Sequence, residues 1–207
     1  MKLLLIILLI LIPSKLLALP HVQVYVEDGT NIPFDTVVAA AFIGLEEQLD
    51  VRAKFSWRTE LIAPACVEES MYSSINFISQ DRYLQCWTGA HPTTRKTAHW
   101  ARMFLVHPYA SRDGTQIAYG GVVNRIGGPG SGIAAVFDRT TVRNFWHAVK
   151  VLQHEIMHLL GARHNCDIMS AVMCAGVWLY EPALIDPRNL KIVNKKLRNK
   201  KLWMKRR

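Results

Sequence analysis

The sequence predicts a single α+β domain behind a cleavable leader. Its 207 residues are enough for one well-buried domain and too few for a comfortable two-domain enzyme. Short alternating or apolar segments typical of strands, together with one helix, fill most of the first two thirds of the chain. Two further helical patterns follow in the last third, and the sequence has no internal repeat.

Residues 1–19 have the layout of a secretory signal peptide. Lys2 precedes an unbroken apolar run from Leu3 to Ile12, and the small residue Ala18 lies at the expected cleavage site. The run is well short of the ~20 apolar residues of a membrane-spanning helix. We therefore expect the leader to be removed and the protein to be secreted to the extracellular space, with an uncleaved anchor as the alternative.

Periodicity and capping residues predict the elements that follow. Residues 21–26 alternate polar and apolar side chains, as a strand does, and Asp35 or Thr36 can cap a helix over residues 37–49. From residue 141 to 160 apolar side chains recur at helical spacing, and Gly161 can end that helix. Other strands are expected at 53–57, 103–106, 117–123 and 133–137, and a last helix after Asp186-Pro187.

Four cysteines in a chain bound for an oxidising compartment predict two disulfide bonds. Three pairings are possible, and the two local ones are favoured: Cys66 with Cys86, and Cys166 with Cys174. The alternative is a set of free buried thiols. The first pair would staple a long irregular segment over residues 60–100.

The strongest functional signal is the string His-Glu-x-x-His-x-x-Gly-x-x-His. His154 and His158 are four residues apart, so they lie on one helix face and can bind one ion. Glu155 lies about 100 degrees round the helix and can hold a water at an open coordination position. Gly161 can turn the chain sharply and bring His164 back as a third ligand. Because catalytic zinc needs three protein ligands and one exchangeable position, the string predicts one catalytic Zn²⁺ ion.

These five residues match every fixed position of the extended metzincin motif, so the chain resembles the metzincin clan of zinc endopeptidases, with the subfamily open between reprolysin-like and matrixin-like. The resemblance implies an α+β fold with an α/β-type N-terminal subdomain. A twisted, mostly parallel five-stranded sheet with an antiparallel edge strand would precede an active-site helix, a methionine turn and a C-terminal helix. The catalytic domain would cover residues 20–197.

The same resemblance implies a mechanism and a methionine beneath the metal. Zinc would polarise the scissile carbonyl and lower the pKa of its bound water, and Glu155 would take the proton as general base. Met173 is preferred for the methionine turn, with Met169 as the alternative, because residues 165–173 resemble the short matrixin-type connection with one residue added. Ordinary core filling is the other interpretation of either methionine.

Two further segments have roles only through the resemblance. The strand Ile117-Ala118-Tyr119-Gly120-Gly121 would be the edge against which an extended substrate is laid, unless it is a plain interior strand. Residues 175–185 would line an apolar side-chain pocket for the residue after the cut, unless they belong to the core; their apolar members are Val177, Trp178, Leu179 and Leu184.

The formal net charge is +9, and it is concentrated at the C-terminus. From Lys195 to Arg207 there are eight basic residues and no acidic one, and residues 198–207 form a basic tail. The tail is either a solvated terminus or an attachment to polyanionic glycans or an anionic membrane surface. Nucleic acid is not expected as a partner of a secreted chain without a recognisable motif.

We therefore expect a monomeric zinc metalloendopeptidase whose main partner is a protein or peptide substrate. The alternative is a non-catalytic metzincin-fold binding protein or effector that acts through its basic tail. The complete set of Glu155 and three histidines argues against that alternative, since a binding protein has no need of the base.

Overall fold

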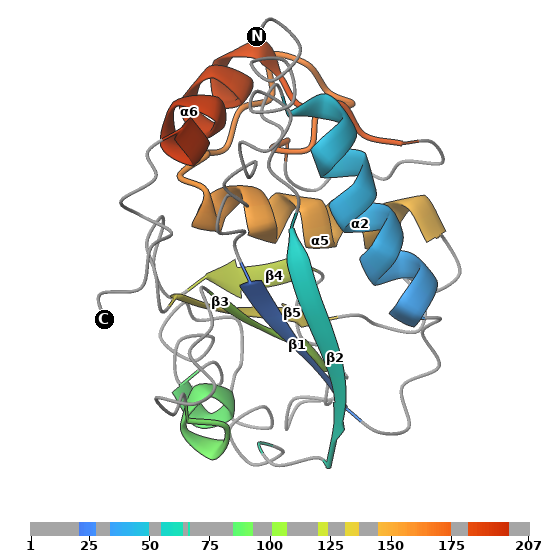
Figure 1. Ribbon diagram of the computed structural model, residues 1–207. Helices are drawn as coiled ribbons and strands as arrows, with labels where there is room; N and C mark the ends of the chain where they lie inside the picture. The colour runs from blue at the N-terminus through green and yellow to red at the C-terminus, as the bar shows by residue number, and fades with distance from the viewer. Residues whose placement is uncertain are drawn as a thin grey trace, which may run out of the picture.

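The computed structural model describes residues 21–27, 34–49, 55–63, 66, 85–92, 101–106, 120–123, 131–136, 145–174 and 182–198. The expected leader and nearly all of the basic tail lie outside these ranges. None of the described helices combines the length and the apolar composition that a membrane crossing requires. The elements, drawn in Figure 1, are β1 (His21–Glu27), α2 (Phe34–Gln48), β2 (Ser56–Ile62), β3 (Ala101–Val106), β4 (Gly120–Val123), β5 (Ser131–Val136), α5 (Phe145–Leu159) and α6 (Pro187–Arg198).

The strands form one sheet in the order β2-β1-β3-β5-β4. β1 is parallel to both of its neighbours, with Val24 opposite Thr59 on β2 and opposite Met103 on β3. β5 continues the parallel arrangement beside β3, and β4 at the far edge runs antiparallel to β5. The α+β class expected from the sequence is confirmed.

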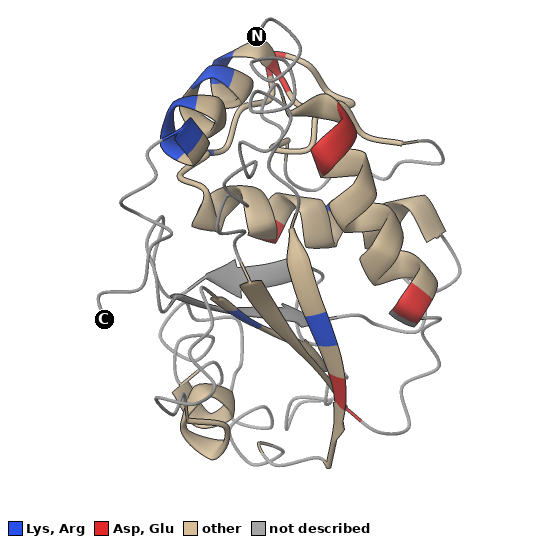
Figure 2. Ribbon diagram, in the orientation of Figure 1, with Lys and Arg blue, Asp and Glu red and all other residues tan. Residues whose placement is uncertain are grey.

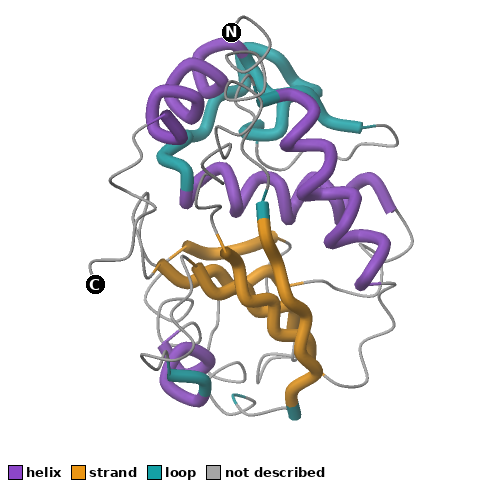
Figure 3. The backbone as a smooth tube through the Cα atoms, viewed as in Figure 1, coloured by secondary structure: helices purple, strands orange, loops and turns teal. Residues whose placement is uncertain are grey.

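The sheet separates two apolar clusters. On one face, Val22, Val24 and Val26 of β1 pack with residues of α2 and α5 in the larger cluster. On the other face, Tyr25 stacks on Phe104 with 5.1 Å between the ring centroids, beside buried Trp87 and the Cys66–Cys86 disulfide. Figure 3 shows α2 and α5 above the sheet and the short helix of residues 85–90 below it. β1 is therefore buried on both faces, although its alternating sequence is typical of a strand with one exposed face.

The second strand lies later in the chain than its sequence pattern indicates. A strand was expected at 53–57, but β2 runs from Ser56 to Ile62, and residues 51–54 lie outside the described ranges. β2 is an edge strand, and Arg58, Glu60 and Leu61 on it are exposed. An edge strand with solvated side chains has no apolar run to mark it, which explains the shift.

Helix α5 lies across the sheet and is packed against α2. Phe42 and Leu45 of α2 share the larger cluster with Leu152 and Ile156 of α5. Gly44 faces α5 so closely that a Cβ there would lie 2.8 Å from Nε2 of Gln153. The helix that was expected over 141–160 is described from Phe145, because residues 137–144 lie outside the described ranges.

Gly161 ends α5 with a double hydrogen bond. The N–H of Gly161 donates to the carbonyl of His158 at 2.9 Å, and the N–H of Ala162 donates to the carbonyl of Met157 at 2.9 Å. This is the Schellman arrangement, and it requires the left-handed backbone that Gly161 adopts with φ of 92°. The chain therefore reverses directly after the second histidine of the motif, as the sequence predicts.

Asp186 begins α6 as its N-cap. Its carbonyl accepts the first helical bond from Leu190 at 2.9 Å, and Oδ1 accepts the N–H of Asn189 at 3.0 Å. The carboxylate also accepts bonds from the side-chain amides of Asn189 at 2.8 Å and of Asn165 at 3.0 Å. Burial by itself would raise the pKa of this carboxyl, but the hydrogen bonds from Asn189 and Asn165 outweigh it and lower the pKa.

We predict that Gly161→Ala lowers the free energy of unfolding by about 1–2 kcal/mol. A Cβ at this position has room, since its nearest neighbour would be Nζ of Lys196 at 3.5 Å, so the cost comes from the backbone conformation alone. Gly161→Asn should cost less, because asparagine tolerates the left-handed region. Urea unfolding of the three proteins measures this, and an alanine variant as stable as the wild type would contradict it.

We also predict a pH-dependent difference between the wild type and Asp186→Asn. At pH 7 the variant should be less stable by about 1–2 kcal/mol, because an amide cannot accept both side-chain amides. The pKa of Asp186 is lowered in the folded protein, so its stabilisation is present above the unfolded pKa of about 3.9 and is lost as pH falls below it.

Urea unfolding of both metal-free proteins at pH 7, 5 and 2.5 measures this difference, and the other carboxyl groups cancel in the comparison. The difference in free energy of unfolding between the two proteins should be constant between pH 7 and 5 and should become smaller at pH 2.5. A difference that stays constant down to pH 2.5 would show that the charge of the Asp186 carboxylate does not contribute to stability.

Candidate metal centre

Three histidine side chains converge at the C-terminal end of α5. His154 and His158 project from one face of the helix, and the turn at Gly161 brings His164 back to them. Nε2 of His164 lies 3.1 Å from Nε2 of His154 and 3.1 Å from Nε2 of His158. Within the described ranges these residues are the one group of at least three potential ligands that could hold a metal ion together.

The hydrogen bonds of the other ring nitrogens decide which nitrogen faces the centre. Nδ1 of His154 donates to the carbonyl of Val172 at 2.8 Å, and Nδ1 of His158 donates to the carbonyl of Ala162 at 3.0 Å. A carbonyl only accepts, so Nδ1 carries the proton in both neutral rings and Nε2 presents a lone pair. Backbone partners of this kind commonly orient histidine ligands of metals.

The donor set fits a zinc ion. Two ligands at 2.0–2.1 Å from a tetrahedral zinc are separated by about 3.3 Å, close to the observed spacing of 3.1 Å. Imidazole nitrogens are zinc ligands, and three of them leave one position of a tetrahedron open. His154, His158 and His164 could therefore hold one zinc ion.

Burial keeps the two helical histidines neutral. The pKa of His154 is lowered to about 4, chiefly by burial and to a smaller extent by the charge of Lys150, against the opposing effect of the bond to Val172. Burial also lowers the pKa of His158. Because a protonated imidazole cannot bind a metal, these two side chains are in their ligand form at neutral pH.

Glu155 lies beside His154 on α5 and is itself buried, with 4% of its surface exposed. Burial raises the pKa of its carboxyl to about 8 in the metal-free protein. A dication nearby acts in the opposite direction, because an opposite charge favours the carboxylate. The protonation of this buried carboxyl would therefore change if a cation bound close to it.

The two candidate methionines differ sharply in environment. Met173 is fully buried in a turn in which the N–H of Cys174 donates to the carbonyl of Ala171 at 3.1 Å. Met169 is 63% exposed. Residues of the same turn are bonded to one of the three histidines and to the loop beside another, since Val172 accepts the bond from His154 and Met173 accepts the N–H of Asn165 at 3.1 Å.

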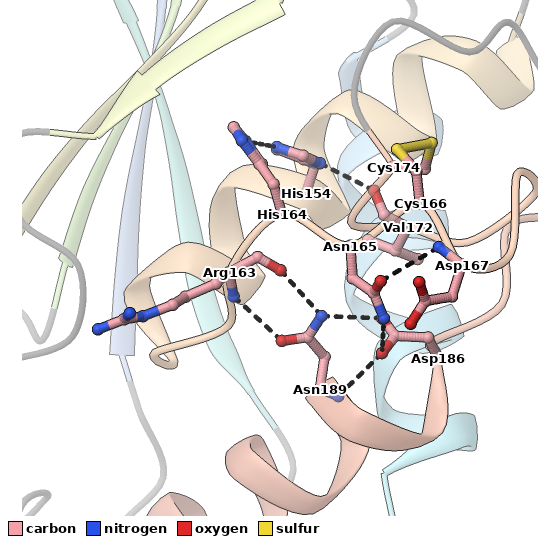
Figure 4. The surroundings of a disulfide bond; sticks show 10 residues. All are labelled: His154, Arg163, His164, Asn165, Cys166, Asp167, Val172, Cys174, Asp186 and Asn189. Atoms are coloured by element: carbon pink, nitrogen blue, oxygen red, sulfur yellow. Dashed lines mark hydrogen bonds between the residues drawn. A yellow bond between two sulfur atoms is a disulfide. The ribbon is translucent and has the colours of Figure 1, made fainter.

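Both disulfide pairings favoured from the sequence are present. Cys66 is joined to Cys86, and Cys166 is joined to Cys174. The second bond ties the loop after His164 to the turn that contains Met173, as Figure 4 shows. It therefore closes a short ring directly beside the histidine cluster.

One group of polar residues near the centre was not predicted as part of the site. Asn189 on α6 accepts the N–H of Arg163 at 3.0 Å and donates to its carbonyl at 2.9 Å. Asn165 and Asn189 both donate to Asp186, and Figure 4 shows this network below the histidines. Asp186 was recognised in the sequence only as a helix cap. Nothing in the local pattern links Asn189 to residue 163.

The expected substrate strand is only partly described. Ile117, Ala118 and Tyr119 lie outside the described residues, whereas Gly120 and Gly121 are the first two residues of β4 at the sheet edge. β4 lies close to α5 as well as to β5.

In the expected pocket segment, Val177, Trp178 and Leu179 also lie outside the described residues. Leu184 is 60% exposed, so it is not part of the core.

No family model and no curated protein sequence matches this chain. Its structure is similar to archaemetzincin from Methanopyrus kandleri, with a TM-score of 0.60 and 15% identity over 91% of this chain and 100% of that one. It is also similar to metalloproteinase-II from Bacteroides fragilis, with a TM-score of 0.52 and 15% identity over 89% of this chain and 55% of that one, so it spans about half of that protein.

At such low identity the similarity concerns the fold alone. The chain shares its fold with these two proteins, and its three histidines lie in an arrangement suited to zinc. The reprolysin-like or matrixin-like subfamily stays a prediction from the sequence.

Proposed function

We propose that the protein is a secreted zinc-dependent endopeptidase. The observation that carries the proposal is the convergence of three imidazole Nε2 atoms, with buried Glu155 adjacent to one of the ligands, in a chain that has a metallopeptidase fold. The leader expected at residues 1–19 and the two disulfides favour an oxidising, extracellular location.

Each residue of the centre has a distinct part in this reaction. Zinc, when bound, supplies a Lewis acid that polarises a carbonyl and acidifies water. His154, His158 and His164 hold it and leave one position open for substrate. Glu155 takes a proton from the attacking water and later delivers it to the departing amine, so no acyl-enzyme forms. Burial of Glu155 limits competition from bulk water for that proton.

The proposed substrate is a protein or peptide segment in extended conformation. Among the described strands β4 is the edge strand beyond β5 and lies close to α5. Glycines such as Gly120 and Gly121 at its start often mark a place where another backbone approaches closely. The exposed Leu184 and the apolar residues Val177, Trp178 and Leu179 favour an apolar side chain just after the cut bond. Met173 is the proposed methionine of the turn beneath the metal, because it is the buried candidate.

We predict that Glu155→Gln abolishes peptide cleavage but keeps one zinc per chain, because the amide preserves the shape of the side chain and cannot accept the proton. His158→Ala should lose both the zinc and the activity. A peptide library, a chelator control and metal analysis of the mature protein measure both quantities. Zinc-loaded, folded wild-type protein that cleaves nothing would contradict the enzyme proposal, and Glu155→Gln with undiminished cleavage would contradict the role of Glu155.

A second surface favours a second partner. Arg188, Lys191, Lys195 and Arg198 are all exposed and recur at helical spacing, so they lie along one side of α6 over about 15 Å. Figure 2 shows this basic stripe, and α6 contains no acidic residue. We propose that the stripe and the tail beyond it bind a sulfated polysaccharide.

The composition of the stripe favours a glycan over a membrane. Helices that lie in a membrane surface insert an exposed apolar face. The apolar residues Val193 and Leu197 of α6 are instead buried in the main core, and its exposed residues are Pro187 and the four basic ones. The exposed side of α6 is therefore basic and has no large apolar side chain that could insert into a membrane.

We predict that Lys191→Glu elutes from a heparin column at lower salt than the wild type, since it reverses a charge in the middle of the stripe. Arg58→Glu is the matched control, because it makes the same change of net charge on exposed β2. Equal elution of the two variants would show that net charge alone governs retention. Binding to anionic vesicles but not to heparin would overturn the glycan proposal.

A further inference from the structure

His164 lacks the supports that hold the other two histidines. His154 and His158 belong to buried turns of α5, and each has its Nδ1 bonded to a backbone carbonyl. His164 is exposed and lies beyond the end of the helix, and within the described part of the chain its Nδ1 makes no such bond. The position of its ring therefore depends on how well the backbone at residues 163–165 is held.

That backbone is held on both sides of His164. Before it, both main-chain groups of Arg163 are bonded to the side-chain amide of Asn189, at 3.0 Å and 2.9 Å. After it, the N–H of Asn165 donates to the carbonyl of Met173 at 3.1 Å, and its side chain donates to Asp186 at 3.0 Å. Asn189 and Asp186 at the start of α6 thus hold the residues on either side of His164.

The segment that carries Asp186 is itself tied to the first half of the chain. Gln48 at the end of α2 donates to the carbonyl of Ala183 at 3.0 Å and accepts the N–H of Ile185 at 2.7 Å. The carbonyl of Leu184 accepts the N–H of Val172 at 2.8 Å, next to the carbonyl that orients His154. Helix α2, the buried turn and α6 therefore form one hydrogen-bonded frame around the loop.

We infer that Asn189, acting together with Asp186 and Asn165, is a positioning residue for the metal. Its paired bonds to Arg163 fix the loop before metal binding, so that the entropy of ordering His164 is lost during folding and not during zinc uptake. The inference rests on the proposed zinc site, but it concerns residues that no metal touches. The Cys166–Cys174 disulfide restrains the loop on the C-terminal side of His164. On the N-terminal side, the backbone of Arg163 is held by Asn189.

The test compares zinc affinity in Asn189→Ala with that in a matched variant, Asn194→Ala. Asn194 is also a buried asparagine of α6, but among the described residues it makes no hydrogen bond to the loop, and its Oδ1 has no hydrogen-bond partner. Affinity is measured by competition with a chromophoric chelator, and the amide exchange of residues 163–165 is measured in the metal-free proteins. Circular dichroism identifies the conditions under which each protein is folded.

Asn189→Ala should bind zinc about 10–100-fold more weakly than the wild type, because partners outside the ligand set typically contribute on this scale. Its Arg163 amide should exchange faster, while Asn194→Ala should match the wild type in both measurements. If Asn189→Ala does not fold, Asn165→Asp serves instead: it keeps the bond from Asp167 at 3.1 Å but places a carboxylate against Asp186.

Unchanged zinc affinity in a folded Asn189→Ala or Asn165→Asp protein would overturn the inference, and so would an equal loss in Asn194→Ala. A wild-type protein that takes up no zinc would overturn the proposed function and the inference together. If the wild type and the folded Asn189→Ala protein bind zinc with the same affinity, the inference is wrong but the proposed zinc site is not affected.

Discussion

The rest of this structure holds three imidazole rings together, with Nε2 of His164 lying 3.1 Å from Nε2 of both His154 and His158. Two of the rings are locked by a helix that is buried along nearly its whole length, and by carbonyl groups that fix their tautomers. Burial also removes their protons, which would otherwise compete with a metal. Apolar packing of α5 in the main core holds the first two rings in place.

The two halves of the chain support the centre in different ways. Before Gly161, a sheet covered by α2 and α5 provides rigidity through packing, so the first two ligands need no local cross-link. After Gly161, the described residues 162–174 and 182–186 form no helix, and they are held by a disulfide, a tight turn and a network of amide and carboxylate hydrogen bonds. Buried Met173 and Val193 join this second half to the main core.

Charge is distributed so that the metal centre and the outer surface are chemically distinct. His154 and His158 are neutral and buried, and Glu155, which follows His154 in the helix, is a buried carboxyl. Four cationic residues of α6 are exposed, whereas Val193 and Leu197 enter the core; the four are Arg188, Lys191, Lys195 and Arg198. Figure 2 marks the basic residues of the helix in blue. A polyanion bound along α6 would therefore leave the histidine cluster free to act on a substrate, since the two surfaces have no residue in common.

Local pattern alone predicted the convergence of His154, His158 and His164, the reversal at Gly161, the Asp186 cap and both disulfide pairs, because these depend on residues a few positions apart or on few cysteines. The role of Glu155 stays a prediction. Only the tertiary structure placed β2, whose exposed edge lacks an apolar run, and separated buried Met173 from exposed Met169. It also revealed the bond between Arg163 and Asn189, which are 26 residues apart. Hydrogen bonds between distant polar residues leave no periodicity in a sequence, since they arise only once the elements that carry them have packed.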